Sequence, residues 1–161
     1  MLNSNHKGTL LLKAHESFIK AKTIITDGGA SKDRIIDTNN CTVMAIAVAL
    51  RLPYKKAHDY ARQAGRKDNE GFWTHKIVET LIKTEGYQIQ YILPKKGLTI
   101  RAMLMDYYRG RYIAVTRDHA FAVVNGTIYD MGFNKPLKRI KYIYRVGNSN
   151  TIKDYIRFNW K

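Results

Sequence analysis

The sequence predicts an α+β domain in which helices come first and a mostly antiparallel sheet follows, with the helices on one face of that sheet. Two observations predict this order. Apolar residues recur at helical spacing up to Gly86, and from there they alternate at the spacing of a strand. The dipeptide Asn125-Gly126 then separates two β-rich runs, which is the strongest short signal for a hairpin.

The length and composition of the chain favour one main domain. With 161 residues, of which 45% are hydrophobic, the chain can bury one good core, and a second independent core would be cramped. We expect a domain over residues 37–146, an extension over 1–36, and a tail over 147–161 that packs as an edge strand or a short helix. Within the extension, residues 10–25 mix helical and strand patterns, and residues 27–31 form a turn or linker.

Three helices are predicted in the first half of the domain. Residues 42–52 are apolar almost all round, which is typical of a helix buried in the middle of a fold, and Asn40 is placed to cap it. Residues 53–64 have apolar side chains at helical spacing and predict an amphipathic helix. A third helix is expected to begin near Thr74, whose hydroxyl can cap it.

The second half is rich in predicted strands. Residues 87–93 alternate like a strand, and Thr99 can then cap a short helix that runs through Tyr108. Further strands are expected over residues 111–116, 119–124, 127–131 and 138–146.

The predicted hairpin can be laid out on paper, because a two-residue loop fixes the register of both strands. Val124 then pairs with Thr127, and Phe121 pairs with Asp130. His119 shares a face of the sheet with Asp130 as its diagonal neighbour, about 7–8 Å away at the backbone. A hydrogen bond between the imidazole and the carboxylate is therefore feasible.

The formal net charge is +15, from 28 Lys and Arg against 13 Asp and Glu. Residues 87–161 hold 14 of the basic and 4 of the acidic side chains, so this part alone contributes +10. Such a field favours anionic partners such as nucleic acid or an acidic protein surface. Tyr107, Tyr108, Arg109 and Arg111 interleave aromatic and basic groups as nucleic-acid contacts do, although half-buried helix packing explains them equally well.

Several classes of protein do not fit the sequence. No stretch approaches the roughly 18 consecutive apolar residues of a membrane span, and the first residues lack the apolar region of a secretory signal, so we expect a cytoplasmic protein. One cysteine cannot form an internal disulfide or a sulfur-rich zinc site. Because no metal-ligand spacing or glycine-rich phosphate loop is present, we predict neither a metal nor a cofactor.

The single cysteine, Cys41, stands where a polar turn becomes the apolar helix. The free amides and the positive dipole at a helix N-terminus stabilise a thiolate there. A cysteine nucleophile is usually activated by a histidine that a third polar group orients, and His119 with Asp130 fits these two roles. The alternative for Cys41 is a buried structural cysteine. Among the other histidines, His75 is a weaker candidate for the base than His119, and the sequence predicts that His58 lies at the surface or at the rim of the site.

Several runs of this sequence resemble papain-like cysteine peptidases, in particular small members from bacteriophages and bacteria. The resemblance lies in residues 40–47, 52–54, 64–67, 118–130 and 144–146, and it covers about residues 37 to 146. It implies a papain-like fold in which Cys41 is the nucleophile, His119 the general base and then acid, and Asp130 the orienting residue. For a phage protein it also implies the cytoplasm of the host cell.

The resemblance departs from the family at one position. Papain carries a glutamine that stabilises the oxyanion six residues before its cysteine, and this chain has Ile35 there. Asn39 is our candidate substitute. Trp73 follows Gly71 and Phe72, and we interpret it as a core anchor rather than a platform for substrate.

Two functions from different classes follow. The first is a thiol hydrolase that cleaves a peptide or isopeptide bond of a protein substrate through a thioester, or that uses the same triad for acyl transfer or deamidation. The second is a non-catalytic basic phage protein that binds nucleic acid or an acidic host protein. Binding through phosphates would weaken steeply with salt, which separates the two experimentally.

Overall fold

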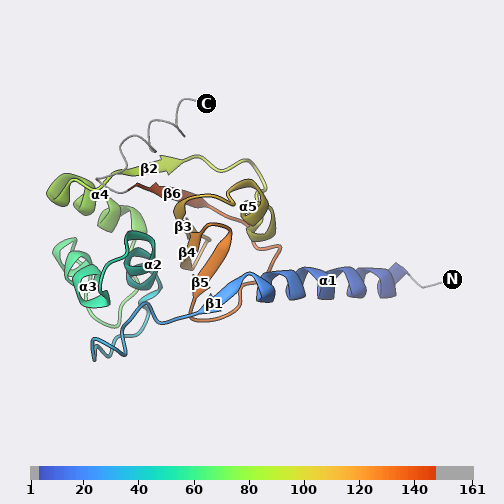
Figure 1. Ribbon diagram of the computed structural model, residues 1–161, viewed down its shortest axis with the longest axis horizontal. Helices are drawn as coiled ribbons and strands as arrows, with labels where there is room; N and C mark the ends of the chain where they lie inside the picture. Colours follow the sequence, from blue (N-terminus) through green and yellow to red (C-terminus); the bar gives the residue numbers. More distant parts are fainter. Residues whose placement is uncertain (1–3, 148–161) are drawn as a thin grey trace.

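The computed structural model describes residues 4–147, and the predicted packing of residues 148–161 lies outside this part. Within it the chain forms helices and strands in the order that Figure 1 shows. They are α1 (Ser4–Ala21), β1 (Thr23–Ile25), α2 (Cys41–Leu50), α3 (Tyr54–Gln63), α4 (Thr74–Glu85), β2 (Ile89–Ile92), α5 (Ile100–Asp106), β3 (Arg111–Val115), β4 (Ala120–Val124), β5 (Thr127–Asp130) and β6 (Tyr142–Val146).

The strands form one mixed six-stranded sheet with the order β1-β5-β4-β3-β6-β2. β1 pairs with β5 in parallel, and every other pair is antiparallel. The predicted α+β class, with a mostly antiparallel sheet after the main helices, is therefore confirmed. β1 joins the sheet directly, so part of the first 36 residues belongs to it.

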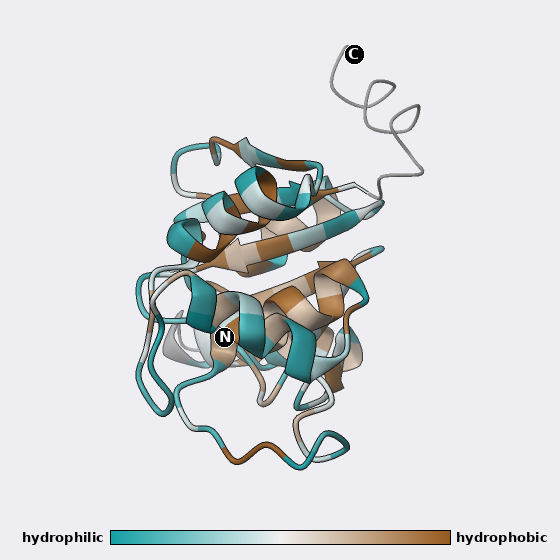
Figure 2. Ribbon diagram, turned by 90° about the vertical axis from the view of Figure 1, so that its left-hand side faces the viewer, coloured by the Kyte–Doolittle hydropathy of each residue, from teal (hydrophilic) through white to brown (hydrophobic). Residues whose placement is uncertain are grey.

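The expectation that helices cover only one face of the sheet is wrong. α2, α3 and α4 pack on one face against residues such as Ile113 and Ala122, and α5 with the end of α1 packs on the other against Phe121 and Ile143 (Figure 1). The central strands are apolar on both faces, so both must be covered to exclude water. Figure 2 shows this as apolar colour concentrated in the central strands and α2.

The predicted hairpin is confirmed in type and register. Val124 pairs with Thr127, and Asn125 and Gly126 both have positive φ, at 48° and 75°. Two residues with positive φ are what a type I′ turn requires, and its twist matches that of the flanking strands. The Asn125 side chain adds a bond by accepting from the amide of Gly110 at 3.0 Å.

Helix α2 is the buried central helix that its sequence predicts, but the side chain of its N-cap residue does not cap the helix as we expect. Asn40 occupies the N-cap position without a side-chain capping bond, and its Nδ2 instead donates to the buried Tyr54 hydroxyl at 2.7 Å. A fully buried hydroxyl needs a partner, and Asn40 supplies it. Likewise Thr74 begins α4 rather than capping it, and its Oγ1 lies 3.1 Å from that of Thr42.

Arg111, one of the basic residues that suggested nucleic-acid binding, instead contacts the C-terminal end of α2. Arg111 donates from Nε to the carbonyl of Ala49 at 2.7 Å and from Nη2 to the carbonyl of Val48 at 2.5 Å. These are carbonyls of the last helical turn, where a cation also meets the negative end of the helix dipole. Arg111 therefore has a structural role in holding α2 against β3.

Helix α1 extends away from the body of the molecule, and only its last turns reach the sheet (Figure 1). Ile19 is 1% exposed and packs in the core beneath α5, whereas Leu11 is 60% exposed.

Among residues 4–147, none of the helices combines the length and the apolar character needed to cross a membrane.

Candidate active site

Cys41 is the first residue of α2, and its side chain is partly buried against the core. The intrahelical bonds of α2 begin with the amide of Met44 donating to the carbonyl of Asn40 at 2.9 Å. The amides of the preceding first turn, including that of Cys41, therefore have no partner within the helix. They concentrate positive potential around the thiol, as the sequence predicts.

His119 and Asp130 meet at one end of two neighbouring strands, because His119 immediately precedes β4 and Asp130 ends the antiparallel β5. Nε2 of His119 lies 2.7 Å from Oδ2 of Asp130. This bond leaves Nδ1 as the ring nitrogen available to a second partner, and His119 and Cys41 lie close enough for each to shift the pKa of the other. The structure thus brings the three predicted residues together in the order Cys41, His119, Asp130.

The carboxylate of Asp130 is held more firmly than the sequence indicates. Its side chain is 2% exposed, and Oδ1 accepts from the amide of Met131 at 2.7 Å. Oδ2 also accepts from Nδ2 of Asn134 at 2.8 Å. Asn134 is a residue that the sequence analysis missed, and it fixes the group that orients the histidine.

The electrostatics of Cys41 and His119 favour an ion pair. Burial raises the pKa of the Cys41 thiol, but the hydrogen bonds from His119 and the Ala120 amide outweigh it and lower that pKa below its ordinary value. The bonds to Asp130 and Cys41 raise the pKa of His119 to about 10. The two shifts have opposite directions, so both favour the ion pair of a Cys41 thiolate with a His119 imidazolium.

A cavity of about 350 Å³ opens beside the thiol. Cys41 and Thr42 line it together with residues from three further segments. These are residues 71–75 at the start of α4 and before it, residues 115–120 around His119, and residues 141, 142 and 144 of β6 and its approach. Phe72, Trp73, Tyr142 and Tyr144 supply aromatic surface in this lining. A chain segment of a substrate can therefore lie against the sulfur.

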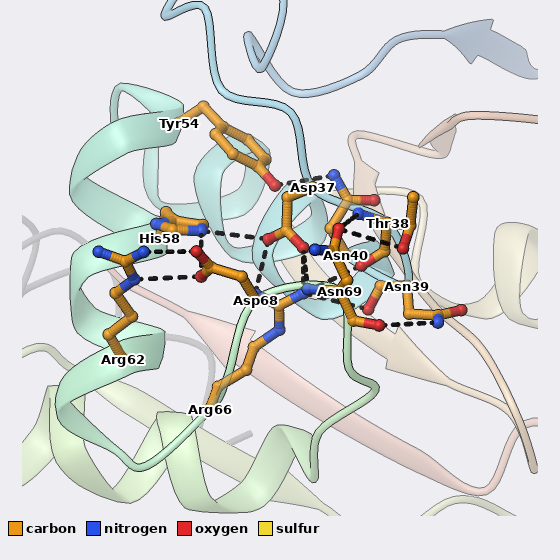
Figure 3. Close-up of polar contacts among 10 residues, drawn as sticks. All are labelled: Asp37, Thr38, Asn39, Asn40, Tyr54, His58, Arg62, Arg66, Asp68 and Asn69. Atoms are coloured by element: carbon orange, nitrogen blue, oxygen red, sulfur yellow. Dashed lines mark hydrogen bonds and ion pairs between the residues drawn. The ribbon is translucent and has the colours of Figure 1, made fainter.

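The segment that leads into Cys41 is fixed by a polar cluster that we call the loop clamp (Figure 3). Arg66 is buried and donates to both carboxylate oxygens of Asp37, at 2.6 and 3.0 Å. The amide of Asn69 also donates to Asp37 at 2.6 Å, and Oδ1 of Asn69 accepts from the amide of Thr38 at 2.9 Å. The clamp joins residues 37–39 to the loop that continues into the cavity wall.

His58 belongs to the loop clamp, which corrects the expectation that it lies at the surface. It is 4% exposed, and its Nε2 lies 3.1 Å from a carboxylate oxygen of Asp37 and of Asp68. The loop after α3 folds back over this helix face and covers it. Arg62 closes the cluster on the outside by pairing with Asp68.

The same three side chains, Asp37, His58 and Asp68, form the one group in the described part of the chain with spacing suited to a metal ion, their ligand atoms lying within 4.8 Å of one another. Both carboxylates already accept from guanidinium groups, Asp37 from Arg66 and Asp68 from Arg62. Two fixed positive charges beside the group oppose a cation, so its geometry fits an ion-pair network better than a metal site.

Two further residues depart from their expected positions. Trp73 is 65% exposed and lines the cavity, so its interpretation as a core anchor is wrong; the polar loop before it carries the side chain outward, away from the core. Asn39, our candidate oxyanion donor, turns toward the loop clamp, where its Nδ2 donates to the carbonyl of Asn69 at 3.1 Å. His75 lines the cavity at its Trp73 side, 6.0 Å from that ring.

Comparisons with known proteins add no relative to this picture. No protein family, no curated protein and no solved structure matches the chain.

Proposed function

We propose that this protein is a papain-like thiol hydrolase that cleaves a peptide or isopeptide bond in a protein or peptide substrate. The observation that carries the proposal is the joint placement of the three side chains. His119 lies 2.7 Å from Asp130, is hydrogen-bonded to Cys41, and faces a cavity large enough for a substrate segment. A merely structural cysteine would not need a histidine or an open cavity beside it.

The reaction follows from these positions. The Cys41 thiolate attacks the acyl carbon in the cavity and forms a tetrahedral intermediate with a negatively charged oxygen. The protonated His119 then gives its proton to the leaving amine as the C–N bond breaks, which leaves a thioester on Cys41. His119 next takes a proton from water, which attacks the thioester and releases the acid, while Asp130 keeps the ring oriented and stabilises its charge.

The negative oxygen of the intermediate needs hydrogen-bond donors. The backbone amide of Cys41 is one, because it lies in the first turn of α2 and has no intrahelical partner. Asn39 could supply a second only by leaving the carbonyl of Asn69. If it does so, Asn39→Ala lowers kcat with little change in KM, because the bond would form only in the transition state.

The same triad can transfer the acyl group to an amine instead of water, or hydrolyse a side-chain amide. These reactions share the thioester on Cys41 and differ in the group that leaves and the group that accepts. Mass spectrometry of the products therefore identifies which of them occurs once the thioester has been trapped.

A mechanism-based label tests the proposal. A peptidyl vinyl sulfone forms a thioether with an activated thiol, and we expect it to label the wild-type protein at Cys41 but not Cys41→Ser. His119→Ala should lower the labelling rate by about 100-fold or more, since general acid-base assistance is worth that much. His6→Ala, a change at an exposed histidine on α1, is the matched control. Equal labelling of His119→Ala and wild type would refute the proposal.

A further inference from the structure

The cavity beside Cys41 has an uneven charge. Arg117 and Lys141 line it from two different segments, and an ion pair of His119 with Cys41 adds no net charge to them. The buried Asp130 carboxylate behind His119 carries one negative charge but does not line the cavity. Lys141 keeps its ammonium group near the aromatic wall, 5.5 Å from the ring centroid of Tyr142. For Arg117, no ion pair with a carboxylate occurs among residues 4–147.

The one carboxylate in the lining, Asp118, does not balance these cations. Its Oδ1 pairs with Nζ of Lys138 at 2.6 Å, and this bond lowers its pKa. Lys138 therefore cancels Asp118 from outside the lining. Glu79 of α4 lies close enough to help raise the pKa of Tyr144, but it does not line the cavity.

Beside these charges the cavity offers an open aromatic surface. Trp73 is 65% exposed, and Phe72 lies next to it in the same wall. Exposed aromatic side chains of this kind bind apolar groups of a partner because contact removes both from water. Aromatic and cationic groups thus share one cavity with the thiol.

We infer that the cavity selects an acidic substrate: a peptide segment with a carboxylate side chain near the scissile bond, held by Arg117 and Lys141, and an apolar side chain against Trp73. This inference rests on the proposed function and adds the class of substrate. Positive potential in a cleft with low-dielectric walls raises the local concentration of an anion, and it disfavours a lysine or arginine in the same place.

Two small alkylating reagents measure this charge directly. Iodoacetate and iodoacetamide present the same reactive carbon to Cys41 and differ in carrying a negative charge or none. The ratio of their second-order rate constants therefore reports the potential at the thiol. At about 0.1 M ionic strength the Debye length is about 10 Å, so only nearby charges contribute strongly.

The test compares this ratio in wild type and in the double variant Arg117→Ala/Lys141→Ala. We expect the ratio to fall by about threefold to tenfold in the variant, while the iodoacetamide rate stays within about twofold. The matched control is Lys7→Ala/Lys13→Ala, which removes the same charge from the exposed outer part of α1 and should leave the ratio unchanged. His119 is unchanged in all three proteins, so its charge does not affect the difference between their rate ratios.

A second measurement uses peptidyl vinyl sulfones that differ in one side chain, with glutamate, glutamine or lysine next to the reactive group. Wild type should react in that order of decreasing rate, and the double variant should lose the preference. An unchanged iodoacetate ratio, or lysine equal to or better than glutamate, would overturn the inference while leaving the proposed function standing. A Cys41 that reacts with none of these reagents would instead remove the proposed function, and the inference with it.

Discussion

His119 interacts with two partners, the Asp130 carboxylate at Nε2 and the Cys41 thiol. The bond to Asp130 fixes the orientation of the ring before any substrate arrives, so little reorganisation is needed when the proton moves. The Ala120 amide completes the environment by donating to the sulfur. The lowered pKa of the thiol thus depends on residues from α2, from the start of β4 and from β5 together.

Asn134 is a positioning residue in this account, and its removal should weaken Asp130's hold on the ring. Asn134→Ala deletes a bond of 2.8 Å to a buried carboxylate, which is worth about 1.5 kcal/mol. We expect the alkylation rate of Cys41 near neutral pH to fall by up to about tenfold and its pH midpoint to move upward. The exposed amide of Gln63 supplies the control, and Gln63→Ala should leave both unchanged. A lower rate with an unmoved midpoint would assign Asn134 a purely structural role.

The three residues of the candidate triad could be predicted from the sequence, but the residues around them that fix their positions could not. Asn125-Gly126 fixes a turn that sets the register, and the register places His119 beside Asp130 without further information. Asn134 lies four residues past Asp130 in an irregular segment, where no periodicity indicates the direction of a side chain. Trp73 was misjudged for the same reason, because its exposure depends on the path of the loop before it.

The loop clamp is the feature that matters most between secondary-structure elements. Asp37 and Arg66 are separated by two helices in the sequence, yet their bidentate pair joins the segment before α2 to the loop after α3. The pair is buried, so each partner depends on the other for its charge to be tolerated. Both the segment before Cys41 and the cavity wall are therefore positioned by one polar cluster.

Breaking the clamp should destabilise the protein strongly and in a pH-dependent way. Asp37→Asn leaves the buried Arg66 unpaired, and we expect a loss of about 3 kcal/mol in the free energy of unfolding at pH 7, measured by urea denaturation. Asp59→Asn, a change at an exposed carboxylate on α3, should cost less than about 0.5 kcal/mol. Equal losses for the two variants would show that the loop clamp does not contribute to the stability of the fold.

The pH dependence of that loss has a definite sign. Burial raises the pKa of Asp37, but the bonds from Arg66 and Asn69 outweigh it and lower that pKa below its ordinary value. A lowered pKa contributes stability that is present above the pKa of the unfolded chain, about 4, and is lost as pH falls through the folded value. The difference between wild type and Asp37→Asn should therefore shrink below about pH 4.

The sequence indicates little of this cluster. Residues 53–64 predict an amphipathic helix correctly, but the pattern does not tell whether a loop will return over its polar face. His58 was expected at the surface because it stands beside Asp59 on a charged helix, and the loop with Asp68 buries it. Buried ion pairs between distant segments have no local pattern, so they appear only once the chain is folded.

At the level of the whole molecule, the end of α1 and the strand β1 belong to the sheet and its core, although the rest of α1 extends away from them. β1 adds a parallel strand next to β5, whose last residue is Asp130, and Ile19 fills the core under α5. The short strand follows α1 almost without a break, which explains why residues 10–25 showed a mixed pattern in the sequence. The sheet that carries the site is thus completed by the start of the chain.

Two substitutions on the same helix test this role. Ile19→Ala removes a fully buried side chain and should cost about 2–4 kcal/mol in the free energy of unfolding. Leu11→Ala changes an exposed position of α1 and should cost no more than its helix propensity, a few tenths of a kcal/mol. Thermal or urea unfolding measures both. Similar small losses would mean that α1 is not anchored to the domain.

The pH dependence of Cys41 alkylation by iodoacetamide is the sharpest test of whether His119 lowers the pKa of the thiol, because the rate follows the fraction of Cys41 that is ionised in the folded protein. The lowered pKa of Cys41 predicts that the wild-type rate reaches half its plateau at a lower pH than the rate of free cysteine does. In His119→Ala the bond that lowers the pKa is gone and burial remains, so the midpoint should rise to that of free cysteine or above. A wild-type profile that follows free cysteine, or one that His119→Ala leaves unmoved, would contradict the account.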